Sequence, residues 1–114
     1  MVFDECYLKY QNSFSHLNYG ITLIYNPTNR DFHAALKYLS RANILNPYLG
    51  DIWGYIVYAS LAVGLDIQAF QAHKEALKLK VSKLDLLKDL SQMWIERKKY
   101  EEARDTLEMG LRTR

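Results

Sequence analysis

Small residues recur along this 114-residue chain at a constant interval of 34 positions. One column consists of Ala35, Ala69 and Ala103. A second column, seven residues later, consists of Ala42, Ala76 and Gly110, and a third column between the two consists of Leu39, His73 and Leu107. Because seven residues make about two turns of an α-helix, each segment carries its small residues on one face. The interval therefore predicts a repeated helix whose small-residue face lets a neighbouring helix approach closely.

Each repeated helix is preceded by another segment with helical periodicity. In the middle of the chain, Ile52, Ile56 and Val57 follow the spacing of an amphipathic helix and not the alternation of a strand. Helix-breaking residues such as Pro27 and Pro47 fall between the segments. The sequence therefore predicts six helices, at residues 12–26, 30–45, 51–63, 66–80, 83–97 and 99–112.

Two helix boundaries carry specific signals. Gly64 followed by Asp66 predicts a C-terminal glycine and then an N-cap. Ser82 with Asp85 three residues later predicts a capping box at the start of the fifth helix. The start of the first helix stays open, because three aromatic residues before it also stand at helical spacing: Phe3, Tyr7 and Tyr10.

The columns resemble the tetratricopeptide repeat, in which a Trp, Leu-Gly and Tyr pattern is followed by Ala, Phe, Ala and Pro. In the middle repeat the matching residues are Trp53, Gly64, Ala69 and Ala76. In the first repeat they are Tyr19, Gly20, Ala35, Leu39, Ala42 and Pro47, with extra residues in the turn after Tyr25. In the third repeat they are Ala103 and Leu107, while Leu87 stands in place of tryptophan.

This resemblance implies an all-α fold, a right-handed α-solenoid of about three helix–turn–helix repeats with six or seven helices. It implies one array over residues 1–114, with repeats at about 12–47, 50–81 and 83–112 and an N-terminal extension at 1–11. The residues that it assigns to packing between helices are Gly20, Ala35, Ala42, Trp53, Ala69, Ala76 and Ala103. Trp94 is expected in the core for the same reason.

A closer resemblance lies in residues 42–55, Ala-Asn-Ile-Leu-Asn-Pro-Tyr-Leu-Gly-Asp-Ile-Trp-Gly-Tyr, and in Lys78–Val81. These stretches look like the C-terminal repeats of the cilia- and flagella-associated protein seventy family. The resemblance implies a structural protein of the axoneme that docks among other ciliary components. It also implies that the chain is a fragment or a short relative, because that family carries additional domains.

Composition excludes several classes of protein. The net charge of +2 is too small to indicate a nucleic-acid partner. Continuous apolar runs are too short to predict a membrane span, and the N-terminus has no signal-peptide pattern. A single cysteine, Cys6, makes no internal disulfide and suits a reducing compartment, so a cytoplasmic location is expected.

No motif predicts an enzyme. The sequence has no glycine-rich phosphate loop, no Ser–His–Asp pattern and no paired catalytic carboxylates. The three histidines, His16, His33 and His73, lack a second ligand at metal-binding spacing. The sequence therefore predicts no cofactor, no metal and no small-molecule substrate.

The first helices of such repeats line a concave surface that commonly binds a peptide or helix. The residues projected onto that surface are Leu17, Ile21, Tyr25, Gly54, Tyr58, Leu61, Lys88, Gln92 and Ile95. An apolar and aromatic groove with a basic, polar end would suit an amphipathic segment that carries acidic residues. The alternative is that Ile21, Leu61 and Ile95 only fill space between helices.

Charge is unevenly distributed along the chain. Residues 1–70 hold four Lys or Arg against five acids, and residues 71–114 hold eleven against eight. The basic residues that cluster in the second part are Lys74, Lys78, Lys80, Lys83, Arg97, Lys98 and Lys99. They predict either a patch for an acidic partner such as a tubulin tail or ordinary charges that favour solubility and helix C-termini.

The sequence as a whole predicts a non-enzymatic scaffold that binds other proteins within a large, microtubule-associated axonemal assembly. The alternative is a free adaptor or co-chaperone-like module that binds a client peptide in its concave groove. A clamp for a terminal carboxylate is disfavoured, because only Lys88 supplies a cation at the positions where that clamp is usual. Nucleic acid and membrane are not expected as partners.

Overall fold

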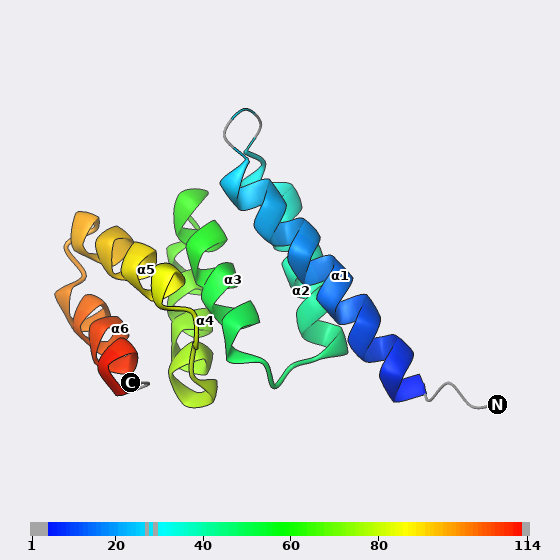
Figure 1. The fold of residues 1–114 in the computed structure, drawn as a ribbon. Coiled ribbons are helices and arrows are strands. Elements are labelled where there is room, and N and C mark those ends of the chain that lie inside the picture. The colour runs from blue at the N-terminus through cyan, green and yellow to red at the C-terminus, as the bar shows by residue number, and fades with distance from the viewer. Residues whose placement is uncertain (1–4, 27, 29, 113–114) are drawn as a thin grey trace.

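The computed structural model describes residues 5–26, 28 and 30–112, and for residues 5–11 and 112 only the backbone. Six helices and their connections account for this part of the chain, which contains no strand (Figure 1). The helices are α1 (Glu5–Tyr25), α2 (Phe32–Leu45), α3 (Gly50–Ala62), α4 (Asp66–Leu79), α5 (Leu84–Glu96) and α6 (Tyr100–Arg112). The predicted all-α class and the six predicted helices are therefore confirmed.

Helix α1 differs most from its predicted bounds. It begins at Glu5 and not at residue 12, so the backward extension left open by the aromatic spacing is the correct alternative. Tyr7 and Tyr10 lie within α1, whereas Phe3 lies outside the described residues. The helix projects beyond its neighbours at its N-terminal end (Figure 1).

The predicted boundary signals are confirmed at the end of one helix and wrong at the start of two others. Gly64 follows α3 with a φ of 84°, a backbone conformation that favours glycine, as the sequence indicated. Asp66 is the first residue of α4 and not its N-cap, so that part of the prediction is wrong. The capping box of Ser82 and Asp85 is also absent, because Lys83 precedes α5 and makes no side-chain cap.

Successive helices form three hairpins, α1 with α2, α3 with α4, and α5 with α6. The hairpins stack in chain order, with α2 against α3, α5 against α3 and α6 against α4 (Figure 1). The described chain extends over 53 × 33 × 23 Å. This arrangement is a helical-repeat solenoid, in which each hairpin covers the apolar face of the next.

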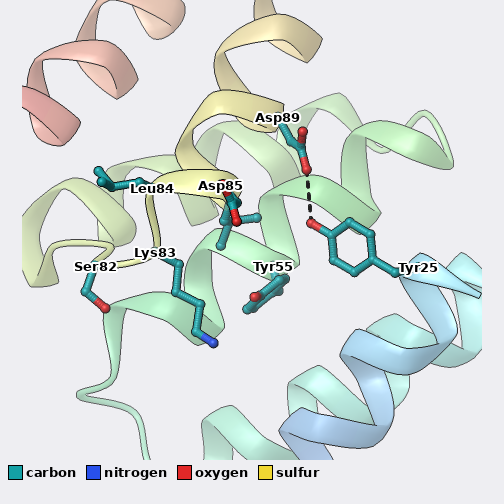
Figure 2. A pocket seen from close by; sticks show the side chains of 8 residues that line it. Tyr25, Tyr55, Ser82, Lys83, Leu84, Asp85 and Asp89 are labelled. Atoms are coloured by element: carbon teal, nitrogen blue, oxygen red, sulfur yellow. Dashed lines mark hydrogen bonds between the residues drawn. The ribbon is translucent and has the colours of Figure 1, made fainter.

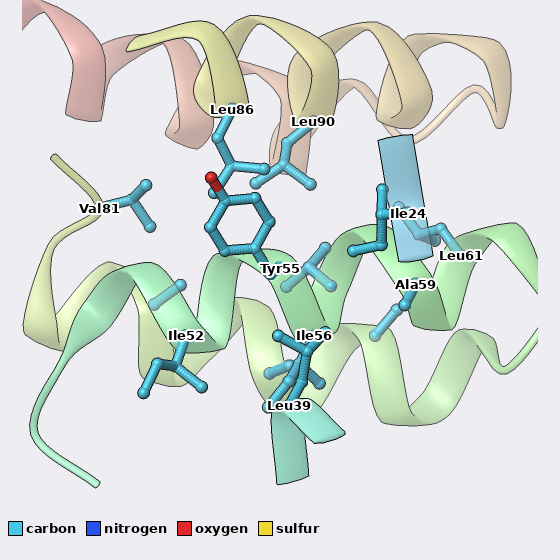
Figure 3. Close-up of a cluster of buried hydrophobic side chains, with 14 of the residues drawn as sticks. Ile24, Leu39, Ile52, Tyr55, Ile56, Ala59, Leu61, Val81, Leu86 and Leu90 are labelled. Carbon is cyan, nitrogen blue, oxygen red and sulfur yellow. The ribbon is translucent and has the colours of Figure 1, made fainter. Parts of the chain in front are cut away.

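The repeated small residues lie in the core. Ala35, Ala69 and Ala103 are 0%, 0% and 3% exposed, and Ala42 and Ala76 are equally buried. Larger side chains from α1, α2, α3 and α5 fill the space between the hairpins, among them those drawn in Figure 3. Trp94 is fully buried, and Trp53 is half-buried with its indole N–H donating to the Pro47 carbonyl at 3.3 Å.

Close backbone approach explains one of the predicted packing residues directly. A Cβ at Gly20 on α1 would lie 3.0 Å from two side-chain carbons of Leu39 on α2. Glycine at this position lets the two helices of the first hairpin pack around the Leu39 side chain, which is completely buried. Among the described residues, none of the helices is long and apolar enough to cross a membrane.

Candidate functional site

A groove of about 730 Å³ opens where α1, α3 and α5 approach one another. Its walls come from the end of α1, the first half of α3, the α4–α5 connection and the start of α5 (Figure 2). The residues that line it are Tyr25, Tyr55, Ser82, Lys83, Leu84, Asp85, Leu86 and Asp89. These residues come from all three hairpins, so the groove exists only in the stacked array.

One hydrogen bond joins the outer walls of the groove. The Tyr25 hydroxyl on α1 donates to Oδ2 of Asp89 on α5 at 3.2 Å, across 64 positions of sequence (Figure 2). Tyr25 is the last residue of α1, and Asp89 lies in the second turn of α5. The bond therefore links the first hairpin to the third over the face of α3.

An aromatic cluster continues the groove along α3. The rings of Tyr25 and Tyr58 are 5.6 Å apart between centroids and tilted by 57°. Phe32 at the start of α2 also stacks on Tyr58, with ring centroids 6.2 Å apart. Tilted and offset ring pairs of this kind stabilise packing beyond the area that they bury.

The tyrosine hydroxyls of the groove are held in the protonated state. Burial, with the Asp89 carboxylate as the next cause, raises the pKa of Tyr25 well above its usual value of 10. Burial also raises the pKa of Tyr55, assisted by Asp51, and that of Tyr58, assisted by Asp89 against an opposing effect of Arg30. At neutral pH these hydroxyls keep their protons, and that of Tyr25 donates to Asp89.

Two carboxylates in the groove lack a cationic partner. No Lys, Arg or His nitrogen of the described residues forms a salt bridge with Asp85 or Asp89. Asp85 is exposed and Asp89 half-buried, and both lie on the groove side of α5. Lys83 lines the same groove at its rim. The groove is therefore aromatic, with two acids and one lysine among its lining residues, whereas the sequence suggested an apolar and aromatic groove with a basic, polar end.

The predicted concave residues divide into three groups. Tyr25 lines the groove, and Tyr58 is half-buried against it. Leu17 and Leu61 are 5% and 0% exposed, so their assignment to the binding surface is corrected to the core. Helix periodicity finds the buried side of each helix but cannot distinguish a residue that lines a groove from one that lies beneath it.

The remaining predicted positions do not line the groove. Gly54 is buried, and a Cβ there would lie 2.9 Å from the Leu86 side chain. Ile21 is half-buried in the core cluster. Lys88, Gln92 and Ile95 are exposed on α5 but do not line the groove.

The sequence did not single out Tyr55 and Asp85 as groove residues, and it considered Asp89 only as a position of the carboxylate clamp that lacks a cation. Asp85 and Asp89 stand four positions apart, which places them on one face of α5, and this spacing is the signal that could have found them. That signal becomes informative only when the direction of this face is known. The packing of Leu86 and Leu90 against α3 sets that direction (Figure 3).

The predicted basic patch does not form one surface. Lys78, Lys80 and Lys83 lie around the connection before α5, and Arg97–Lys99 lie after it. Because α5 has 13 residues, these groups are separated by about 20 Å along the helix axis. The exposed Lys74 belongs to neither group, since it lies mid-way along α4.

Several of these cations also have internal partners. The Arg97 guanidinium donates to the Leu61 carbonyl at the end of α3. The Lys99 ammonium lies 5.6 Å from the centroid of the Phe70 ring, and Lys78 pairs with Glu75 at 3.6 Å. These contacts support the alternative in which the basic residues stabilise helix ends and solubility.

Among the described residues, the histidines are dispersed and not gathered in one cluster. Within the described residues, no cluster of three or more His, Cys, Asp or Glu side chains could hold a metal ion. His16 stacks on Tyr38 with ring centroids 6.0 Å apart, and His33 is exposed. His73 is 5% exposed and packs edge-on to Trp94, with Nε2 3.8 Å from Oδ2 of Asp105.

An apolar hollow of about 450 Å³ lies between α5 and α6, at the C-terminal end of the array. Leu107 and Leu111 on its rim are 51% and 66% exposed, and Leu84 is 49% exposed. The position of His73 in the preceding repeat is occupied here by Leu107. This face is the counterpart, one repeat later, of the surface with which α3 and α4 receive α5 and α6.

Comparison with known proteins gives a partial resemblance. Cilia- and flagella-associated protein 70 of Macaca fascicularis and that of Homo sapiens are each 40% identical to this chain over 52 residues. The aligned segment covers 46% of this chain and 5% of each relative, so the chain corresponds to a small part of those proteins. No protein-family model matches the chain. The ciliary resemblance is thereby supported, while assignment to the tetratricopeptide family stays a prediction.

Proposed function

We propose that this chain is a non-enzymatic scaffold module of a ciliary or flagellar assembly, and that it binds a partner protein in the groove between α1, α3 and α5. The observation that carries the proposal is the groove itself. Three hairpins contribute to one open surface with exposed tyrosine and carboxylate groups, a composition suited to protein recognition. The resemblance to cilia- and flagella-associated protein 70 supports a ciliary or flagellar setting, within which our proposal places the chain in the cytoplasm, on the axoneme.

Binding, and not catalysis, is the chemistry that these groups favour. The Tyr25 hydroxyl is a poor general base because its raised pKa keeps the proton in place. Asp89 accepts a hydrogen bond from that hydroxyl, and no hydrogen bond joins it to a serine, cysteine or histidine side chain of the described residues. The groove therefore has positioned donors and acceptors that suit binding.

A free adaptor that carries a client is the second candidate, because a single copy of the chain forms the whole groove. Such a module would bind its client without being anchored in a larger structure. The scaffold and adaptor proposals differ in where the protein resides, since only a scaffold would remain with axonemes after washing with salt.

The experiment combines fractionation with site-specific crosslinking. The full chain carries a photo-crosslinking amino acid at position 83, on the rim of the groove, or at position 71, on the exposed side of α4 away from it. The scaffold proposal predicts retention on salt-washed axonemes from ciliated cells and a discrete crosslinked partner at position 83 only. A soluble protein that crosslinks at position 83 would support the adaptor. Equal crosslinking at both positions would overturn binding through the groove.

A further inference from the structure

The charge of the groove points to the chemistry of its occupant. We propose that the groove binds a basic segment of a partner protein, and that an arginine side chain enters between the tyrosines of α1 and α3 and the carboxylates of α5. This inference rests on the proposed function and specifies the partner at the same site. It reverses the sequence expectation of an acidic partner.

Asp85 and Asp89 provide the first part of the argument. They lie one helical turn apart on α5, so their carboxylates face the same side. Asp89 uses Oδ2 to accept from Tyr25, which leaves its other oxygen for a second donor. The Asp85 side chain makes no hydrogen bond or salt bridge with the described residues. Two carboxylates therefore line the groove, together with one lysine, Lys83.

The aromatic rings provide the second part. Tyr25 and Tyr58 pack against each other beside Asp89, and Tyr55 lines the groove next to them. A guanidinium group can stack on a tyrosine ring while its N–H groups pair with a carboxylate. A lysine ammonium makes the ionic contact but lacks the planar stacking surface, and so arginine suits this site better.

The positive net charge of the chain is compatible with a negatively charged groove. Arg97 and Lys99 lie beyond the C-terminal end of α5 and are engaged with Leu61 and Phe70. Screening at physiological ionic strength limits the reach of exposed charges to about 8 Å. The charges that a bound segment meets are therefore those of the groove, where acids outnumber lysine.

The test measures binding of defined peptides to the full chain by fluorescence anisotropy. The probe is a nonapeptide of repeated arginine–alanine–leucine triplets with a neutral dye, compared with versions in which lysine or glutamate replaces arginine. We expect the arginine peptide to bind more tightly than the lysine peptide by about threefold or more, and the glutamate peptide not to bind. Tighter binding of the glutamate peptide would overturn the inference.

Two matched substitutions separate the groove from general charge attraction. Asp89→Asn keeps an acceptor for the Tyr25 hydroxyl but removes the negative charge. We expect this substitution to weaken binding of the arginine peptide about tenfold. Asp66→Asn removes the same charge from the start of α4, outside the groove, and should change binding less than twofold. Equal losses in the two variants would overturn the inference. Circular dichroism on both variants checks that the helices are intact.

The outcomes also distinguish this inference from the function on which it rests. If position 83 crosslinks an axonemal partner while the arginine peptide binds no better than the glutamate peptide, the inference of a basic partner is wrong and the scaffold proposal is retained. If the arginine peptide binds in the groove but the chain does not remain with axonemes, the scaffold proposal is wrong and the inference of a basic partner is retained.

Discussion

At the junction between the first and second hairpins α2 lies along α3, whereas at the next junction α5 lies along α3 and α6 along α4. The first junction consists of apolar and aromatic contacts. Leu39 lies next to Ile56 and Ile24 lies on the side of Leu61 (Figure 3), and Phe32 stacks on Tyr58. Among the described residues, no side-chain hydrogen bond joins α1 or α2 to α3 or α4.

The second junction contains directional anchors in addition to apolar packing. The Asp51 carboxylate on α3 accepts from the Ser82 backbone N–H at 2.7 Å and from its hydroxyl at 2.8 Å, just before α5 begins. Gly54 on α3 accommodates the Leu86 side chain. Hydrogen bonds depend on angle and distance, while apolar burial depends mainly on area, so the second junction has the more strictly defined register.

This difference matters for the groove because its acids come from α5 and its tyrosines from α1 and α3. The second junction holds Asp85 and Asp89 in a defined position relative to Tyr55. The first junction positions Tyr25 by packing, and the Tyr25–Asp89 hydrogen bond then connects the two parts. Substitutions at the two junctions should therefore have effects of different size and character.

The largest effect is expected from Gly50→Ala. A Cβ at this buried position would overlap the Lys80 carbonyl oxygen and lie 2.7 Å from its carbon, so the α4–α5 connection would have to move. We expect a loss of at least about 3 kcal/mol in the free energy of unfolding, measured by urea denaturation with circular dichroism. The control is Gly110→Ala, whose Cβ would meet Leu87 at 3.6 Å and should stabilise α6 by about 0.5–1 kcal/mol. An unchanged free energy of unfolding in Gly50→Ala would mean that the second junction can shift to accept the added methyl group and is no more strictly defined than the first.

Asp51→Ala tests the polar anchor. Removing the carboxylate takes away both bonds to Ser82, and we expect a loss of about 2–3 kcal/mol by chemical denaturation. The matched control is Asp85→Ala, one repeat later, where the exposed carboxylate has no internal partner and removal should cost under about 1 kcal/mol. Similar losses in the two variants would show that the anchor contributes nothing specific.

Tyr58 tests the apolar character of the first junction. Tyr58→Ala removes the ring that contacts Tyr25 and Phe32, and we expect a loss of about 2 kcal/mol in thermal unfolding. Tyr58→Phe keeps the ring and removes a hydroxyl without a hydrogen-bond partner among the described residues, so it should cost less than about 0.5 kcal/mol. A large loss in Tyr58→Phe would reveal a polar contribution at this junction.

His73 gives the second junction a dependence on pH. Burial lowers the pKa of His73 below its usual 6.5, and the carboxylates of Asp105 and Glu102 offset only part of the shift. The unfolded chain therefore takes up the proton at a higher pH than the folded chain. The contribution of neutral His73 to stability is present above pH 6.5 and is lost as the pH falls below that value.

His73→Leu should remove the loss of folding stability at acid pH. Leucine stands in the same column at Leu39 and Leu107, and it leaves no buried imidazole nitrogen without a hydrogen bond. We expect a gain of about 1 kcal/mol at pH 5 and a smaller gain at pH 8, measured by thermal unfolding at both pH values. The exposed His33 is the control, and His33→Ala should retain the acid sensitivity of the parent chain. An unchanged acid sensitivity in His73→Leu would assign it to another group.

Much of the fold could be predicted because its determinants are local. The spacing of Ile52, Ile56 and Val57 defines one face of α3, and the glycine at position 64 ends that helix wherever the hairpin packs. The prediction failed at Asp66, which is the first residue of its helix, and at the Ser82–Asp85 pair, where Ser82 has another partner. Ser82 bonds to Asp51, which is 31 positions away and invisible to local reasoning.

The candidate site was harder to predict than the fold. Tyr25 and Tyr58 were predicted on one surface, because the first helices of stacked hairpins share a side; the structure places Tyr25 in the groove and Tyr58 against it, and their binding role stays a prediction. Leu17 and Leu61 were misplaced, because periodicity reports the buried side of a helix without the depth of burial. The acidic character of the groove was missed, since it depends on how α5 is rotated against α3.

The sequence by itself determined the number of helices, their pairing into hairpins and the small residues that let the hairpins pack. It could do so because a helical turn spans fewer than four residues, and so the pattern is written within each segment. Only the tertiary structure decided the sign of the charge in the groove and the separation of the basic residues into two groups. Electrostatic effects depend on distance through space, and that distance is set by the packing of hairpins far apart in the chain.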